Sequence, residues 1–207
     1  MFKYELSHPD IREGIKKLCD KFDADYWQKC DRENSYPLKF VNELSDAGYL
    51  SALIPEKFGG LGLPISAGSA ILEEIHRSGG NAAACHAQMY TMGTLLRHGS
   101  EAQKNKYLPD IASGNKRLQA FGVTEPNSGT DTTSLQTTAR LEGNTYYING
   151  QKIWTSRAEY SDLILLLAKS DNSNIRKNNL SLFLIDMRPH LNKSIFIKPI
   201  KTMNHIS

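Results

Sequence analysis

The hydrophobic pattern of this chain changes its period near residue 117, and this change constrains the fold most. Before that point apolar residues recur at steps of three and four, as Ile11, Ile15 and Leu18 do. After it they alternate at every second position. The first period is that of a helix with one buried face, and the second is that of a strand. We therefore predict an α+β protein, with an all-helical domain at residues 1–116 and an antiparallel β-domain at residues 117–207.

Capping signals mark the helices of the first half. Ser7, Pro9 and Asp10 predict the start of a helix whose apolar stripe continues to Tyr26, because proline and acidic residues suit a first helical turn. Ser100 and Gln103 have the spacing of a capping box. Further helices are predicted from Ser35 and Pro37 to a stop at Gly48, over Ser66–Arg77, over Asn81–Arg97, and from Ser100 towards Leu108.

Short segments of period two predict the strands of the second half. They are Leu118–Thr124, Gln136–Leu141, Thr145–Ile148, Lys152–Thr155, Leu163–Ala168, Leu180–Asp186 and Ile195–Ile200. Glu142-Gly143-Asn144 and Asn149-Gly150 predict hairpin turns, and the polar segment Ser170–Asn179 predicts a surface loop. The last strand would leave an open sheet edge, so we expect an incomplete β-domain and a chain that is a piece of a longer protein.

Composition excludes several classes of function. The net charge of +3 is spread along the chain without a basic block, which gives nucleic-acid binding no support. The longest apolar run, Leu163–Ala168, is too short to span a membrane, and the first thirty residues lack a signal-peptide core. The three cysteines are isolated, which favours free thiols and predicts no metal site. A cytoplasmic enzyme is the expectation.

Two polar segments of the second half carry the groups that a flavin ring needs. Phe121–Thr124 offers backbone N–H groups and a hydroxyl, and Trp154–Ser156 offers an indole and further hydroxyls. A flavin ring requires an apolar or aromatic wall and hydrogen-bond donors at its polar edge. Two strand ends that converge on one face of a small β-domain would supply both. Taken alone, however, the pattern is explained better by a core tryptophan beside a solvent-exposed turn.

Three motifs resemble segments of the acyl-CoA dehydrogenase family. Thr-Glu-Pro followed by Gly-Thr-Asp, within Thr124–Asp131, is similar to the family's Thr-Glu-Pro-x-x-Gly-Ser-Asp. Gln-Lys-Ile-Trp-Thr-Ser, at Gln151–Ser156, resembles its Lys-x-Trp-Ile-Thr segment, and Pro55–Leu63 resembles its Pro-Glu-x-Tyr-Gly-Gly-Leu-Gly loop. The motifs occur in the family's order and span essentially the whole chain. By itself the glycine-rich loop predicts a turn between helices, because no strand precedes it and Pro64 follows it.

The resemblance implies an FAD-dependent dehydrogenation of a fatty or branched acyl-CoA thioester. It also implies an electron-transfer flavoprotein as acceptor and a homodimer or homotetramer. The family's catalytic base is a glutamate of a C-terminal four-helix domain, which is expected to be absent from this chain, so no catalytic residue is assigned. The implied cofactor-binding residues are Phe121, Val123, Thr124, Thr130, Trp154, Thr155 and Ser156, and Thr130 is also implied to contact the substrate.

Two features depart from the family pattern, and two alternatives stay open. Thr130 and Ser156 stand where the family usually has serine and threonine, so the geometry of these hydroxyls is less certain than their presence. The same fold could serve a flavin-dependent monooxygenase or oxidase, or a scaffold without catalysis. Glu125, which precedes a proline, is expected to pin the turn rather than to transfer protons.

Overall fold

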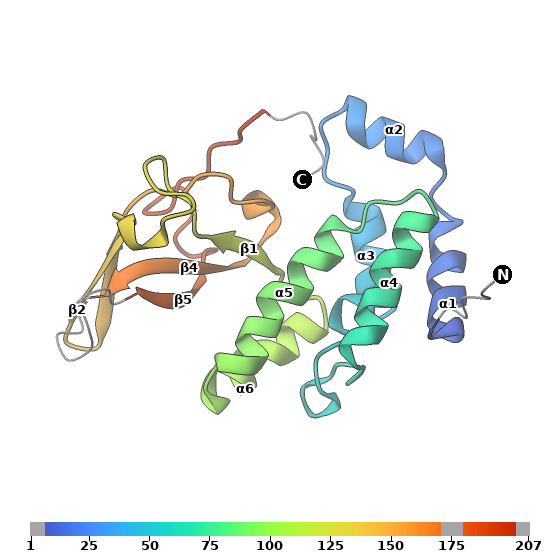
Figure 1. Cartoon of the computed structure of the whole chain (residues 1–207), viewed down its shortest axis with the longest axis horizontal. Helices are drawn as coiled ribbons and strands as arrows, with labels where there is room; N and C mark the ends of the chain where they lie inside the picture. Colours follow the sequence, from blue (N-terminus) through green and yellow to red (C-terminus); the bar gives the residue numbers. More distant parts are fainter. Residues whose placement is uncertain (1–6, 171–179, 202–207) are drawn as a thin grey trace. The chain divides into compact units, whose positions relative to one another are not determined.

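The computed structural model describes residues 7–170 and 180–201, which fall into two compact units. The first unit includes the chain up to Arg117 together with Lys201, and it is helical; the second runs from Leu118 to Ile200 and contains a sheet (Figure 1). A helical N-terminal part followed by a β-sheet part is the predicted order. Each unit is described on its own terms below.

The helical unit contains six described α-helices and two short 3-10 turns. Their bounds are α1 Pro9–Cys19, α2 Ala24–Arg32, α3 Leu38–Asp46, η1 Tyr49–Ser51, η2 Glu56–Phe58, α4 Ile65–Arg77, α5 Ala83–His98 and α6 Glu101–Ala112. The single helix predicted from Pro9 to Tyr26 is wrong, because it divides into α1 and α2. α1 ends at Cys19, and Asp23 caps the start of α2 by accepting a hydrogen bond of 2.9 Å from the backbone N–H of Tyr26.

The capping box at the start of α6 is confirmed. The Ser100 hydroxyl accepts from the backbone N–H of Gln103 at 3.2 Å, and the Gln103 side chain accepts from the N–H of Ser100 at 2.9 Å. Apolar side chains from α1, α3, α4 and α5 form one buried cluster, which includes Ile15, Phe40 and Ile71. Burial of this cluster is the main stabilisation of the helical unit.

The glycine-rich loop is the predicted turn between helical elements, running from η2 to α4. The N–H of Gly62 donates to the carbonyl of Ile54 at 2.8 Å, which folds the loop back on itself. A Cβ at Gly60 would lie 2.6 Å from the carbonyl carbon of Ile54, so only glycine allows this approach.

The second unit contains a five-stranded sheet in which β4 is central. The strands are β1 Leu118–Gly122, β2 Thr138–Glu142, β3 Thr145–Asn149, β4 Leu163–Ser170 and β5 Leu180–Asp186. Their order is β1-β4-β2-β3, with β5 paired to β4; β1, β4 and β5 lie side by side in Figure 1. The predicted antiparallel sheet is wrong in this respect: β4 runs parallel to β1 and β2 and antiparallel to β5. Alternating side chains reveal a strand but not the direction of its neighbour, which the connections decide.

Two of the predicted strands are not strands in the structure. Lys152–Thr155 is irregular, because Lys152 is drawn into a buried ion pair and Trp154 has a φ of 59°. Ile195–Ile200 is extended without a ladder and makes only an isolated bridge between Leu191 and Ile195 among the described residues. The turn around Gly143 is confirmed between β2 and β3, with a φ of 59° at the glycine. Nearly all of the predicted loop Ser170–Asn179, and residues 202–207, lie outside the described residues.

Candidate functional site

The two polar segments singled out in the sequence meet in the β unit. The backbone N–H of Ile153 donates to the carbonyl of Thr124 at 2.9 Å. The ammonium of Lys152 donates to the carbonyl of Val123 at 3.0 Å. The end of β1 and the segment that carries Trp154 are therefore hydrogen-bonded neighbours. The strand-end geometry predicted for Trp154 is wrong, but the convergence of the two segments is present.

Glu125 forms the polar centre of this convergence. Its carboxylate accepts from the N–H of Gln136 at 2.6 Å, the N–H of Thr137 at 3.0 Å and the ammonium of Lys152 at 2.7 Å. Burial alone would raise the pKa of Glu125, but these hydrogen bonds, led by that from Lys152, outweigh it and lower the pKa to about 2. The carboxylate is thus ionised and fully engaged, which agrees with its expected role of pinning the turn.

The loop after Glu125 is held by its own short polar side chains. Glu125 and Ser128 exchange two backbone hydrogen bonds, of 2.8 and 3.1 Å. The Asp131 carboxylate accepts from the hydroxyls of Ser134 and Thr133, and these bonds lower the pKa of Asp131. Thr130 lies between these two fastened points and is exposed. Its hydroxyl is accordingly presented to solvent on a braced loop.

Trp154 combines a strained backbone with an exposed side chain. It has a φ of 59°, which is uncommon for a residue with a bulky side chain, and the residue is 61% exposed. Arg157, at a φ of 58°, is a second left-handed residue, and its carbonyl accepts from the Ser161 hydroxyl at 2.9 Å. Backbone strain of this kind persists where the surrounding structure fixes it, and it concentrates at functional sites. Ser156 lies between the two strained residues and is exposed.

The residues predicted to bind a cofactor lie in three neighbouring stretches of the β unit. Phe121 belongs to β1, Val123 and Thr124 follow it, Thr130 lies in the braced loop, and Trp154, Thr155 and Ser156 follow Lys152. An exposed indole beside exposed and half-buried hydroxyls supplies an aromatic wall and donors. This donor set fits the chemistry of a flavin ring.

Sequence reasoning missed the role of Lys152. It read this residue as part of a strand, whereas its side chain is only 8% exposed and is paired with Glu125. The available signal was an acidic residue in one motif and a basic residue in the other. Because the two motifs were expected to converge, their opposite charges could have predicted an ion pair between them.

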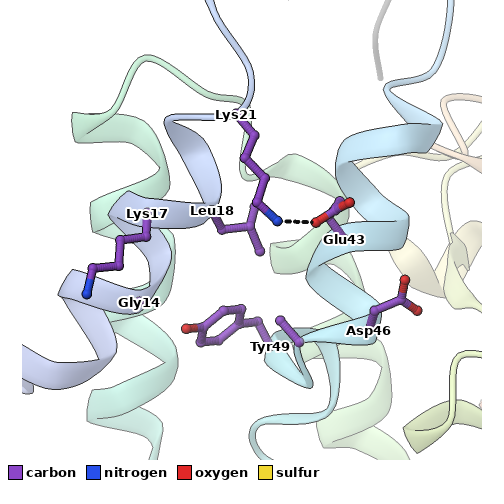
Figure 2. Close-up of a pocket in the computed structure, with 8 residues that line it drawn as sticks. Gly14, Lys17, Leu18, Lys21, Glu43, Asp46 and Tyr49 are labelled. Carbon is purple, nitrogen blue, oxygen red and sulfur yellow. Dashed lines mark hydrogen bonds and ion pairs between the residues drawn. The ribbon is translucent and has the colours of Figure 1, made fainter.

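The helical unit has a cleft of its own, distinct from these residues. It has a volume of about 260 Å³ and lies between α1, α3 and η1, as Figure 2 shows. Lys21 and Glu43 form an ion pair of 2.7 Å at its rim, and Lys17 is paired with Glu13. The residues that line it are Gly14, Lys17, Leu18, Lys21, Glu43, Asp46, Ala47 and Tyr49. None of them was predicted from the sequence to bind a ligand.

Two structural findings concern metal sites and membrane-spanning helices in the described part of the chain. Across residues 7–170 and 180–201, no three His, Cys, Asp or Glu side chains gather in a way that could hold a metal ion. None of the helices in those ranges is both long enough and apolar enough to cross a membrane.

Comparison with protein families covers nearly the whole chain. Residues 6–115 match the family model described as acyl-CoA dehydrogenase, N-terminal domain, and residues 120–203 match acyl-CoA dehydrogenase, middle domain. A glutaryl-CoA dehydrogenase from Desulfococcus multivorans is 33% identical over 190 residues, which are 89% of this chain and 47% of the relative. The chain spans about half the length of the curated relatives that it matches.

Two solved structures show the same arrangement of elements. An acyl-CoA dehydrogenase from Bacillus anthracis, complexed with FAD, has a TM-score of 0.74 and 27% identity, over 89% of this chain and 32% of that one. A prolyl acyl carrier protein oxidase, AnaB, has a TM-score of 0.82 and 25% identity, over 98% of this chain and 54% of that one.

Proposed function

Because this chain belongs to the acyl-CoA dehydrogenase family, with that family's N-terminal and middle domains, we propose that it forms the flavin-binding part of an FAD-dependent acyl-CoA dehydrogenase. The proposed reaction is the α,β-dehydrogenation of an acyl-CoA thioester to a 2-enoyl-CoA. The observation that supports the proposal is the backbone hydrogen bond between Ile153 and Thr124, which joins the segment of the exposed Trp154 to the segment that resembles the family's flavin-contacting motif.

Each residue has a proposed task. Val123 and Thr124 hydrogen-bond to the polar edge of the ring through backbone and hydroxyl groups, and Phe121 supports that segment from β1. Trp154 covers one face of the ring and excludes water from it. Bound FAD would supply the acceptor for the hydride that leaves the β-carbon of the substrate.

The hydroxyls on the exposed loops complete the proposed site. Ser156 offers a hydrogen-bond donor to the reactive edge of the ring, assisted by Thr155 beside it. Thr130 is proposed to contact both the cofactor region and the acyl-CoA. The base that removes the α-proton is proposed to come from outside these 207 residues. An electron-transfer flavoprotein as acceptor, a homodimeric or homotetrameric assembly and a cytoplasmic location belong to the same proposal.

A flavin titration of the 207-residue chain tests the proposal. The indole N–H signals of Trp27 and Trp154 report in a ¹H–¹⁵N NMR spectrum on one residue of each unit. We expect weak binding of FAD that shifts the Trp154 signal and leaves the Trp27 signal in place, with no bleaching of the flavin by a panel of acyl-CoA thioesters. An unshifted Trp154 signal at millimolar FAD would refute the flavin site. Rapid bleaching by an acyl-CoA would refute the outside base.

A flavin-dependent oxidase is the second candidate, favoured by the likeness to the prolyl acyl carrier protein oxidase over 98% of this chain. The two candidates differ in what reoxidises the flavin. Fast oxygen consumption by the reduced, complete enzyme would support the oxidase. Slow reaction with oxygen and fast transfer to an electron-transfer flavoprotein would support the dehydrogenase.

A further inference from the structure

The ion pair between Lys152 and Glu125 ties together three stretches of chain that are separate in sequence. Lys152 bonds to the Val123 carbonyl and to the Glu125 carboxylate, at 3.0 and 2.7 Å. The same carboxylate accepts the backbone N–H groups of Gln136 and Thr137. The two side chains are 8% and 3% exposed, so the pair is enclosed on all sides.

Polar bonds join the segment that carries Trp154 to the end of β1. Residues 151–157 form no strand in the described sheet, and the tryptophan itself is 61% exposed. The hydrogen bonds that join them to the end of β1 include the backbone bond from Ile153 to Thr124 and the bonds donated by the Lys152 ammonium. Directed polar bonds, and not a sheet ladder, therefore join this segment to the end of β1.

An enclosed ion pair is a poor means of adding stability but a good means of fixing geometry. Removing two charges from water offsets most of their attraction, so apolar residues of equal volume often stabilise as well. Charge-assisted hydrogen bonds are short and directional, which apolar contacts are not. Because the two charges cancel, the pair also adds no net charge beside a bound ring.

We propose that Lys152 and Glu125 are positioning residues, whose ion pair sets the distance between the Val123–Thr124 edge and the Trp154–Ser156 segment so that both reach one flavin ring. The inference rests on the proposed function, because the ion pair can position flavin-binding groups only if a flavin binds here. It assigns the pair no proton transfer and no direct contact with substrate.

The test replaces the pair by neutral side chains of similar size, E125Q/K152M, and titrates the chain with FAD. The introduced glutamine side chain keeps an acceptor for one of the two backbone N–H groups, those of Gln136 and Thr137, and no lone charge is left buried. We expect the dissociation constant for FAD to rise about tenfold or more, because a misplaced binding group loses most of its contribution. At saturation, the ring-current shift of the Trp154 indole signal should shrink, because the indole no longer lies in its place over the ring.

A second variant keeps the test decisive if the double variant does not fold. E125D retains both charges but shortens the acidic arm by one methylene, so a positioning role predicts weaker FAD binding and a smaller shift. The matched control is K116M, which breaks an ion pair of the same 2.7 Å length with Asp110 in the helical unit. It should leave the FAD titration unchanged.

The outcomes separate the two hypotheses. If the unsubstituted chain does not respond to FAD, the proposed function fails and the positioning role fails with it. If the unsubstituted chain responds, and folded E125Q/K152M or E125D has the same dissociation constant and the same Trp154 shift, the positioning role alone is overturned. A weaker dissociation constant with a smaller shift, and an unchanged K116M, supports it.

Discussion

Each unit of this chain has an enclosed basic side chain that is paired with carboxylates, Arg12 in the helical unit and Lys152 in the β unit, and the two are used differently. Arg12 joins α1 to α4 through Glu73 at 2.6 Å and Glu74 at 3.3 Å, but Glu73 is 47% exposed. The two helices also share the buried apolar cluster of the helical unit. Lys152 and Glu125 are both enclosed, and they join irregular segments.

The difference shows what a charge contributes in each setting. Where apolar burial already fixes two helices, an ion pair with one solvated partner adds little to stability. Where the chain is irregular, the proposal gives the enclosed pair control of the arrangement, and loss of one partner leaves the other charge buried without compensation. The helical unit should therefore tolerate changes of its charges, and the β unit should not.

The largest expected effect on the unfolding free energy comes from removing the enclosed cation of each ion pair in turn, Lys152 or Arg12. Lys152→Met should destabilise the β unit by about 3–5 kcal/mol, because Glu125 is left ionised and enclosed. Arg12→Met should cost the helical unit only about 1–2 kcal/mol, since Glu73 faces solvent and Glu74 still lies 3.7 Å from Arg77. Urea unfolding followed by NMR signals of each unit measures both losses. Equal losses would end the distinction between the two pairs.

Low pH should affect the stability of the two units differently as well. The pKa of Glu125 is lowered from 4.5 to about 2 in the folded state, so the carboxylate stabilises the fold fully above pH 4.5. That stabilisation is lost as the pH falls from about 4.5 to 2, and it amounts to about 3 kcal/mol. The unfolding free energy of the β unit, measured at steps of pH, should fall over this window. In E125Q/K152M the same fall should be smaller by that amount; an unchanged slope would show that Glu125 is not its source.

The contrast between the units also explains how far the sequence could predict the fold. Helix ends follow local rules, so the capping box at Ser100 and the turn at Gly60 were predictable from a few residues. The break between α1 and α2 was missed, because the apolar stripe continues past Asp23 although α1 ends at Cys19 and Asp23 caps the start of a new helix. The direction of β4 relative to β1 was also missed, because it depends on a long connection.

The candidate site was predictable in membership but not in geometry. The motifs named both segments, and their convergence is present in the Ile153 to Thr124 hydrogen bond. The left-handed backbone of Trp154 could not be read from the sequence, because no glycine or asparagine marks it. The pairing of Lys152 with Glu125 joins residues that are distant in the chain, and its sequence signal was the opposite charges of the two motifs.

A smaller effect is expected at the start of α6. Ser100→Ala removes the acceptor for the Gln103 backbone N–H and should cost the helical unit about 1 kcal/mol. The loss should appear in the urea transition of the helical unit alone, with the Trp154 signal unchanged. Ser100→Asp is the matched control, because it restores an acceptor at the cap and should recover most of the loss. No difference between the alanine and aspartate variants would contradict a capping role.

The smallest expected change in stability lies at Trp154, and its sign is the informative part. Glycine is at ease at a φ of 59°, so Trp154→Gly should relieve about 1 kcal/mol of backbone strain, partly offset by the greater freedom of glycine in the unfolded chain. Because the indole is exposed, little packing is lost with it, and a net gain of up to about 1 kcal/mol is expected in the β unit.

Trp154→Ala is the matched control, since it lacks the indole but keeps the Cβ that makes this φ unfavourable. Both variants should lose FAD affinity, and only the glycine variant should gain stability. A glycine variant less stable than the alanine variant would mean that the left-handed backbone at Trp154 carries no strain, because only the entropic cost of glycine would then remain. A stable glycine variant with unchanged FAD affinity would mean that the indole is not the wall of a flavin site. The two readouts thus separate what this residue costs the fold from what it contributes to the ligand.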